Sequence, residues 1–333
     1  MKRLFLALGA LALAASASGC SNSVYSSGEG PNLVVTSNNY YYLAIDLDGV
    51  EITGNGPKFR IWTLMNNPNV DPHEFEPSAK DRLLLANSDL VIYTGTEYDQ
   101  WVDQIVETTG IDKGKLISAN KSRAPFQCST NVDLTQSLKA ECRDRKTNPH
   151  LWYDLTSTEL LAKQISIEFG KVQPQHEKTY VRALKAFEGD VKRLRQLQNK
   201  VKTQIAPGSY FFGPDNLSNI FLRDLGLRPI VDYSNKFANG IELSAKEMAG
   251  VKELMRTKQI KLFAANTSVP STQAAELQAY AKSQYIPIVK FSESDICDRS
   301  KLHVGGPGLY SGCFEQKIYE VGIKLHVQLP GRA

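Results

Sequence analysis

Apolar residues follow two kinds of pattern in the first part of the chain. Short apolar runs at residues 33–36, 59–64 and 90–93 predict buried strands. Periodic apolar positions at residues 78–87 and 98–109 predict helices between and after these strands. Strands that alternate with helices are typical of a parallel sheet covered by helices. We therefore expect an α/β lobe in this part of the chain.

The same alternation returns in the second part of the chain. Strand-like runs are found at residues 210–212, 260–264 and 286–289. Helical patterns accompany them at residues 216–224, 245–256 and 272–283. The sequence therefore predicts a second α/β lobe, again with parallel sheet and covering helices.

A longer regular pattern separates the two parts. Apolar residues recur there every three or four positions, at Tyr180, Leu184, Phe187, Val191, Leu194, Leu197 and Val201. Lysines and arginines crowd the other positions, so the pattern predicts an amphipathic helix of about 28 residues and about 40 Å. A coiled-coil arm would give the same pattern. Its place midway between two α/β patterns favours a rigid spine that joins two lobes.

The N-terminus has the pattern of an exported protein. Lys2 and Arg3 precede an apolar run at residues 4–15, which is too short to span a bilayer but suits a signal peptide. The run is followed by Gly19 and Cys20, which resemble a bacterial lipobox, so we expect Cys20 to be lipidated. Ordinary signal-peptidase cleavage nearby, without a lipid, is the alternative.

The expected organisation follows from these patterns. We expect a signal peptide at residues 1–19 and a lipidated flexible tether, rich in serine and glycine, at residues 20–32. An N-terminal α/β lobe at residues 33–170, the spine helix at 171–205 and a C-terminal α/β lobe at 206–330 complete the chain. Its 333 residues suffice for two domains that each bury a core.

The charge balance excludes one class of partner. The formal net charge of +4 includes Lys2 and Arg3, so the mature chain carries about +2. No dense basic patch occurs, and the sequence gives no reason to expect nucleic acid as a partner.

The mature chain contains four cysteines beyond Cys20, namely Cys128, Cys142, Cys297 and Cys313. An even number in an exported chain indicates disulfides. Four cysteines permit three pairings, and we favour Cys128–Cys142 and Cys297–Cys313 because short loops close most readily. A zinc site made of all four thiolates is the alternative, but no pair has the close spacing that such sites use.

Two proline-histidine steps stand in distinctive surroundings. The first stretch reads Asp71-Pro72-His73-Glu74-Phe75-Glu76-Pro77, and the second reads Thr147-Asn148-Pro149-His150-Leu151-Trp152-Tyr153-Asp154. Proline fixes its own φ and biases the preceding residue toward extended backbone, so a Pro-His step aims an imidazole stiffly. We interpret His73 and His150 as two metal ligands that the fold brings together.

These stretches resemble the ligand loops of the metal-binding solute-binding lipoproteins of bacterial manganese, zinc and iron ABC transporters. Residues 89–93, Gly95 and Trp101 follow the first stretch as that family's pattern expects, and the long helix resembles the family's interlobe spine. The resemblance runs from about Leu33 to Leu325. It implies that His73 and His150 bind metal from the N-terminal lobe.

The resemblance also implies two ligands from the C-terminal lobe. The third ligand of the family, a His or Glu, precedes a helix, and counting back from Leu225 and Gly226 puts Asp215 at that position. Asp215 could instead only cap that helix. The fourth ligand is usually an Asp after a Pro-containing strand, where this chain has Glu293. Asp295 and Asp298 are close competitors, and a solvated loop acid is a further alternative for Glu293.

What the resemblance implies about function is binding rather than catalysis. Two imidazoles and two carboxylates suit manganese or ferrous iron as cargo, and still admit zinc. Residues 121–146 contain no histidine, whereas many zinc-binding members carry a His-rich loop there. The implied partners are an ABC permease and the membrane, through the N-terminal lipid. We expect a monomer, held outside the cytoplasmic membrane on its periplasmic or extracellular face.

Two other functions remain as alternatives. A metallohydrolase would need an open coordination position and a general base, for which Glu74 beside His73 is a candidate. Because all four implied ligands are protein groups, no position is left open for water, which favours binding. A surface adhesin is the second alternative, and it has no sequence signature.

Overall fold

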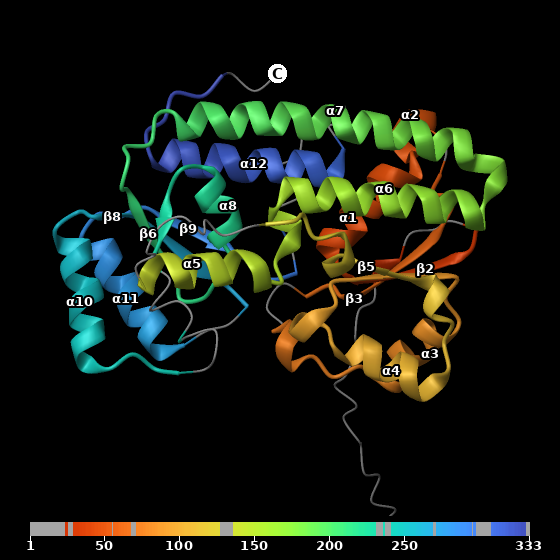
Figure 1. The fold of residues 1–333 in the computed structure, drawn as a ribbon, viewed down its shortest axis with the longest axis horizontal. Helices are drawn as coiled ribbons and strands as arrows, with labels where there is room; N and C mark the ends of the chain where they lie inside the picture. The colour runs from red at the N-terminus through yellow and green to blue at the C-terminus, as the bar shows by residue number, and fades with distance from the viewer. Residues whose placement is uncertain are drawn as a thin grey trace, which may run out of the picture.

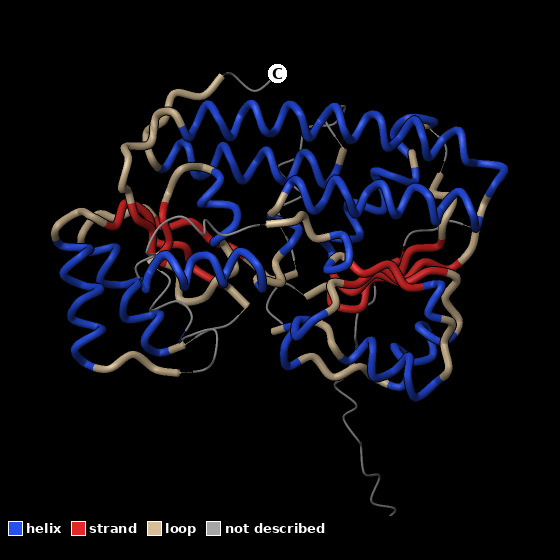
Figure 2. The backbone as a smooth tube through the Cα atoms, viewed as in Figure 1, coloured by secondary structure: helices blue, strands red, loops and turns tan. Residues whose placement is uncertain are grey.

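Two α/β lobes lie side by side beneath one long helix in the computed structural model (Figure 1). The structure describes residues 24–25, 29–54, 56–67, 71–126, 136–230, 236, 241–268, 271–294, 296–297 and 308–330. Each lobe contains one sheet, with helices on its faces (Figure 2). The predicted fold class is confirmed.

The N-terminal sheet has the strand order β1-β3-β2-β4-β5. Its strands are β1 (Val24–Tyr25), β2 (Asn32–Ser37), β3 (Arg60–Met65), β4 (Leu90–Tyr93) and β5 (Leu116–Ser118). The pairs β2–β3, β2–β4 and β4–β5 are parallel. The edge strand β1 is antiparallel to β3, so a strand pairs within the segment that the composition predicted as a tether.

Helices cover both faces of this sheet, as the continuous apolar runs of its strands predicted. Along β2, Leu33 and Val35 belong to one apolar cluster and Val34 to another. The helices are α1 (Asn38–Asp48), α2 (Val50–Thr53), α3 (Ala79–Ala86), α4 (Trp101–Thr109) and α6 (Leu155–Val172). Helix α5 (Gln136–Thr147) precedes α6 in the chain but lies beside the C-terminal sheet (Figure 1). Figure 1 shows α1 and α6 on one side of the sheet and α3 and α4 on the other.

The C-terminal sheet is entirely parallel, in the order β7-β6-β8-β9. Its strands are β6 (Tyr210–Phe212), β7 (Arg228–Pro229), β8 (Ile260–Asn266) and β9 (Ile288–Phe291). The accompanying helices are α8 (Asn219–Asp224), α10 (Ala245–Arg256), α11 (Thr272–Ser283) and α12 (Leu309–Lys324). Helix α8 begins three residues later than the pattern at residues 216–224 predicted.

The predicted spine is α7 (Glu177–Lys202), which has 26 residues. Its buried face includes Phe187, Val191 and Leu194, as the periodic pattern required. It packs against α1 and α6 of the N-terminal lobe and against α8 and α12 of the C-terminal lobe. One apolar core therefore runs through both lobes, and the spine restricts how far they can move apart.

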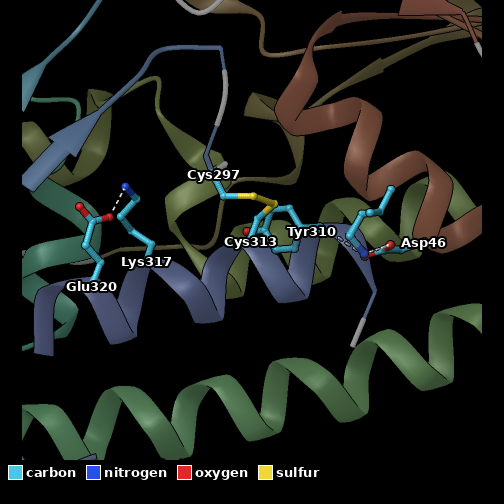
Figure 3. The surroundings of a disulfide bond; sticks show 7 residues. Asp46, Cys297, Tyr310, Cys313, Lys317 and Glu320 are labelled. Atoms are coloured by element: carbon cyan, nitrogen blue, oxygen red, sulfur yellow. Dashed lines mark hydrogen bonds and ion pairs between the residues drawn. A yellow bond between two sulfur atoms is a disulfide. The ribbon is translucent and has the colours of Figure 1, made fainter. Parts of the chain in front are cut away.

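Helix α12 ties the C-terminal lobe to the N-terminal lobe (Figure 3). The Asp46 carboxylate of α1 accepts hydrogen bonds from the backbone N–H groups of Leu309, at 2.6 Å, and Tyr310, at 3.0 Å. The Tyr310 hydroxyl donates to the Trp152 carbonyl at 2.5 Å. The two Asp46 contacts satisfy free N–H groups at the start of α12 with a side chain of the other lobe.

The predicted disulfide Cys297–Cys313 is present and joins the loop after β9 to α12 (Figure 3). Those two cysteines are therefore not ligands of a four-thiolate zinc site. Cys142 is also disulfide-bonded. Its expected partner Cys128 lies outside the described residues, as does Cys20.

Across the described part of the chain, no helix combines the length and the apolar character that crossing a membrane would require.

Candidate metal centre

Polar residues of both lobes meet at the carboxyl ends of their strands. Asp215 follows β6, Asn266 ends β8 and Glu293 follows β9. The loop after β3 leads to His73 in the short 3-10 turn Pro72–Glu74. In parallel α/β sheets, ligands bind in the crevice at this edge of the strands.

His150 lies at the start of another 3-10 turn, Leu151–Tyr153, and is 2% exposed. Asn148 Oδ1 lies 2.9 Å from the His150 backbone nitrogen and 2.9 Å from its ring Nδ1. On the other side of the ring, Nε2 lies 2.8 Å from Glu293 Oε2. Neither His150 Nε2 nor Glu293 Oε2 has a further hydrogen-bond partner among the described residues.

Groups of both lobes hold Glu293, which is also 2% exposed. Its backbone carbonyl accepts hydrogen bonds from the Tyr98 hydroxyl, at 2.9 Å, and from Asn39 Nδ2, at 3.0 Å. Its backbone N–H donates to Ser268 Oγ at 3.1 Å. The carboxylate is therefore fixed where the lobes meet, and it is not the solvated loop acid that the sequence left open.

Asn266 links the two carboxylates of the C-terminal lobe. Its Nδ2 donates to Asp215 Oδ2 at 2.6 Å and to Glu293 Oε1 at 2.8 Å. Asp215 Oδ1 also accepts from the Leu217 N–H at 2.9 Å, so Asp215 closes a local turn ahead of α8. One oxygen thus performs a local capping role, while the other faces the polar centre.

His73 approaches from the N-terminal lobe with an exposed side chain. The Asp71 carboxylate accepts from its backbone N–H at 2.9 Å, and its ring Nδ1 lies 3.3 Å from the Glu97 carbonyl. The ring centroid of Tyr98 is 5.7 Å from that of His73 and 6.1 Å from that of His150. Tyr98 therefore lies against both imidazoles and against the Glu293 backbone.

The charges of this centre are strongly coupled. Burial alone would lower the pKa of His150, but the Glu293 carboxylate outweighs burial and the pKa is raised. Burial would likewise raise the pKa of Glu293, but His150, with a further contribution from His73, lowers it. Burial and the neighbouring Glu293 charge raise the pKa of Asp215 to about 6. His150 and Glu293 consequently form a buried ion pair.

The donor set matches divalent transition metals, because imidazole nitrogens and carboxylate oxygens are their usual protein ligands. Among the described residues, however, no group of three or more His, Cys, Asp or Glu side chains forms a ready metal-binding cluster. His150 and Glu293 contact each other directly instead. The structure thus brings His150, Asp215 and Glu293 into one hydrogen-bonded centre, with His73 beside it against Tyr98.

Sequence reasoning missed the residues that organise this centre. Asn266 lies two residues beyond the predicted strand 260–264, at the same sheet edge as Asp215 and Glu293, and this position was the available signal. Tyr98 and Asn39 gave no comparable signal. The competing acids Asp295 and Asp298 lie outside the described residues, and so does His303.

The fold and the site together define the class of this protein. It has two α/β lobes under one spine helix, and polar groups of both lobes meet at the strand ends. This chain belongs to the family described as zinc-uptake complex component A, periplasmic, whose model matches residues 51–295. The resemblance recognised in the sequence is confirmed.

Curated relatives belong to the same group of proteins. The chain is 26% identical over 138 residues to the iron ABC transporter substrate-binding lipoprotein MtsA of Streptococcus pyogenes. It is 20% identical over 255 residues to a putative metal-binding protein of Treponema pallidum, over 74% of this chain and 78% of the relative. The match to MtsA covers 40% of this chain and 41% of the relative, so the chain spans less than half of that relative's length.

Solved structures share the fold. The periplasmic zinc-binding protein TroA of Treponema pallidum is 16% identical, with a TM-score of 0.64 over 89% of this chain and 99% of that one. The binding protein FpvC of Pseudomonas aeruginosa, solved with Mn²⁺, is 18% identical, with a TM-score of 0.62 over 90% and 99% of the two chains. At these identities the likeness establishes the fold alone.

Proposed function

We propose that this protein is an extracytoplasmic solute-binding protein that captures a divalent transition metal and delivers it to an ABC permease. One observation carries the proposal: His150 of the N-terminal lobe and Glu293 of the C-terminal lobe face each other at 2.8 Å in a buried centre. A divalent cation in the place of the shared proton would satisfy both ligand atoms and join the lobes.

The ligands in this proposal are His73, His150, Asp215 and Glu293. His150 Nε2 and Glu293 Oε2 are buried atoms without other hydrogen-bond partners among the described residues, as direct ligand atoms should be. Asp215 is drawn toward Glu293 by Asn266, and His73 would complete the set from the exposed side. Two imidazoles with two carboxylates favour manganese or ferrous iron and admit zinc.

Delivery and location complete the proposal. Membership of a metal-uptake family supports an ABC permease as the partner, and the lipobox-like Gly19-Cys20 supports a lipid anchor outside the cytoplasmic membrane. Because the spine packs against both lobes, release would involve small shifts between them rather than wide opening. A hydrolase acting through Glu74 has no support from the geometry, since that side chain is exposed on the turn that carries His73.

The test is metal binding by the purified mature protein, measured by calorimetric titration with manganese and with zinc. His73→Ala and His150→Ala should each abolish high-affinity binding while circular dichroism shows an intact fold. His326→Asn is a matched control, because that histidine is exposed beyond α12 and has φ 57°, which Asn tolerates. Near-normal affinity in either imidazole variant would overturn the site assignment.

A further inference from the structure

Four hydrogen bonds fix the orientation of the Asn148 side-chain amide. Its Oδ1 accepts from the backbone N–H and the ring Nδ1–H of His150, both at 2.9 Å. Its Nδ2 donates to the Asn216 carbonyl at 2.8 Å and to Asp144 Oδ1 at 3.3 Å. With acceptors on one side and donors on the other, rotating the amide would break all four bonds. The His150 proton therefore stays on Nδ1, and Nε2 is left to face Glu293.

Asp144 links this network to helix α8 of the C-terminal lobe. It lies on α5, which runs beside that lobe (Figure 1), and is 3% exposed. Its Oδ2 accepts from Arg223 Nη2 at 2.9 Å and from Asn219 Nδ2 at 3.2 Å. Arg223 and Asn219 both lie on α8 of the C-terminal lobe, and Arg223 also pairs with Glu141 of α5 at 3.2 Å.

The chain of contacts runs from His150 through Asn148 and Asp144 to Arg223. Every member is nine-tenths or more buried, so burial strengthens these hydrogen bonds and makes each unpaired group costly. Removing Arg223 would leave the Asp144 carboxylate buried without its cation. Asp144 could then recover only by moving toward water, which would also pull on the Asn148 amide.

We propose that Asp144 and Arg223 are positioning residues for His150: through Asn148 they fix which ring nitrogen faces the metal, and they couple that orientation to the position of helix α8 in the C-terminal lobe. The inference rests on the proposed role of His150 as a metal ligand. It adds that α5 and α8, neither of which carries a proposed ligand, hold that ligand in place. A shift of α8 relative to His150 would disturb the alignment of the imidazole and speed metal release.

A nearby ion pair supplies a matched control. Arg145 of α5 and Asp224 of α8 join the same two helices at 4.0 Å, and within the described part of the chain neither side chain hydrogen-bonds to Asn148 or Asp144. Asp224→Asn removes this pair and keeps the size of the side chain. If the network variants bind metal weakly only because the α5–α8 contact is weakened, Asp224→Asn should bind weakly too. If the proposed network is responsible, Asp224→Asn should bind metal normally.

The experiment measures manganese dissociation constants by competition for Asn148→Ala, Asp144→Asn, Arg223→Gln, Asp224→Asn and His150→Ala. Asn148→Ala should weaken binding about 10–100-fold, the usual effect of losing a histidine's outer partner. Arg223→Gln should weaken it less, and adding it to Asn148→Ala should cost less than the product of the two effects, because both act through one path. Asp224→Asn should bind as the unaltered protein does.

A second readout separates positioning from simple stabilisation. In the zinc-loaded protein, nitrogen NMR of the histidine rings should show the His150 proton on Nδ1, and Asn148→Ala should populate the other ring form. Urea unfolding of each variant gives its stability independently. A purely structural network would lower stability but leave the dissociation constant and the ring form unchanged, and that result would overturn the inference.

The variants distinguish a wrong network inference from a wrong metal site. If His150→Ala abolishes binding while Asn148→Ala, Asp144→Asn and Arg223→Gln bind normally, the network inference is wrong and the proposed function stands. If His150→Ala itself binds normally, the proposed site is wrong. Should Arg223→Gln not fold, Asp144→Asn and Asn148→Ala still decide the question.

Discussion

Metal binding should release protons, because the His150–Glu293 pair holds one where the metal would bind. The Glu293 charge raises the pKa of His150 above its usual value near 6.5, so at lower pH the imidazole is protonated on both nitrogens. A metal needs the Nε2 lone pair, so the proton on that atom must leave. Glu293, whose pKa is lowered, is already ionised above about pH 4.5 and releases none.

The size of the effect follows from these shifts. Between the pKa of Asp215, about 6, and the raised pKa of His150, each pH unit of acidification should weaken the apparent affinity about tenfold, which is about 1.4 kcal/mol. Asp215, whose pKa is about 6, should release a second proton when the pH falls below that value. The protons that His150 and Asp215 release per metal should therefore approach two near pH 5, be close to one between about pH 6.5 and the His150 pKa, and fall toward zero above that pKa.

Calorimetric titrations in buffers of different ionisation enthalpy count these protons directly. Replacing His150 with Gln should reduce the count by one below the His150 pKa, wherever weak binding is still measurable. His326→Asn, which alters a distant exposed histidine, should leave the count unchanged. A count near zero at about pH 6 in the unaltered protein would refute the reasoning. It would mean that the metal does not displace the proton between His150 and Glu293, so this pair would not bind the metal.

Three further predictions concern the surroundings of the site. Replacing Cys297 and Cys313 together with Ser opens a loop of 16-residue separation, so urea unfolding should show a loss of about 3 kcal/mol, and an unchanged midpoint would contradict this. Asp215→His should shift the ratio of manganese to zinc dissociation constants toward zinc in competition titrations, and an unchanged ratio would mean that Asp215 only closes its local turn. Asp46→Ala removes the carboxylate that caps α12 from the other lobe, so it should lower the free energy of unfolding by about 1–2 kcal/mol. Asp46→Asn should lose less stability, and equal stability of all three proteins would contradict the capping role.

Much of the fold was predictable because its signals are local. The apolar runs of β2 and β4 and the periodic face of α7 depend on residues close in sequence. The edge strand β1 could not be predicted, because its pairing with β3 depends on a partner far along the chain. The start of α8 was misplaced for a local reason: the Asp215 side chain accepts the Leu217 N–H and holds a separate turn ahead of the helix.

The site was predictable to a more limited extent. Stiff Pro-His steps and a family resemblance indicated His73 and His150, and counting along the chain indicated Asp215 and Glu293. The structure brings three of these into direct or bridged contact. The roles of Asn266, Asn148 and Asp144 could not be read from the sequence, because amide and carboxyl side chains are common and their function depends on which groups the fold places opposite them.

The central claim is that both lobes bind one metal ion through His73, His150, Asp215 and Glu293. Anomalous scattering from crystals grown with manganese, collected at an energy where manganese scatters anomalously, tests it most directly. The account predicts one strong peak within about 2.0–2.4 Å of ligand atoms from all four residues, with His150 bound through Nε2. A peak elsewhere, or one contacted by a single lobe, would contradict it.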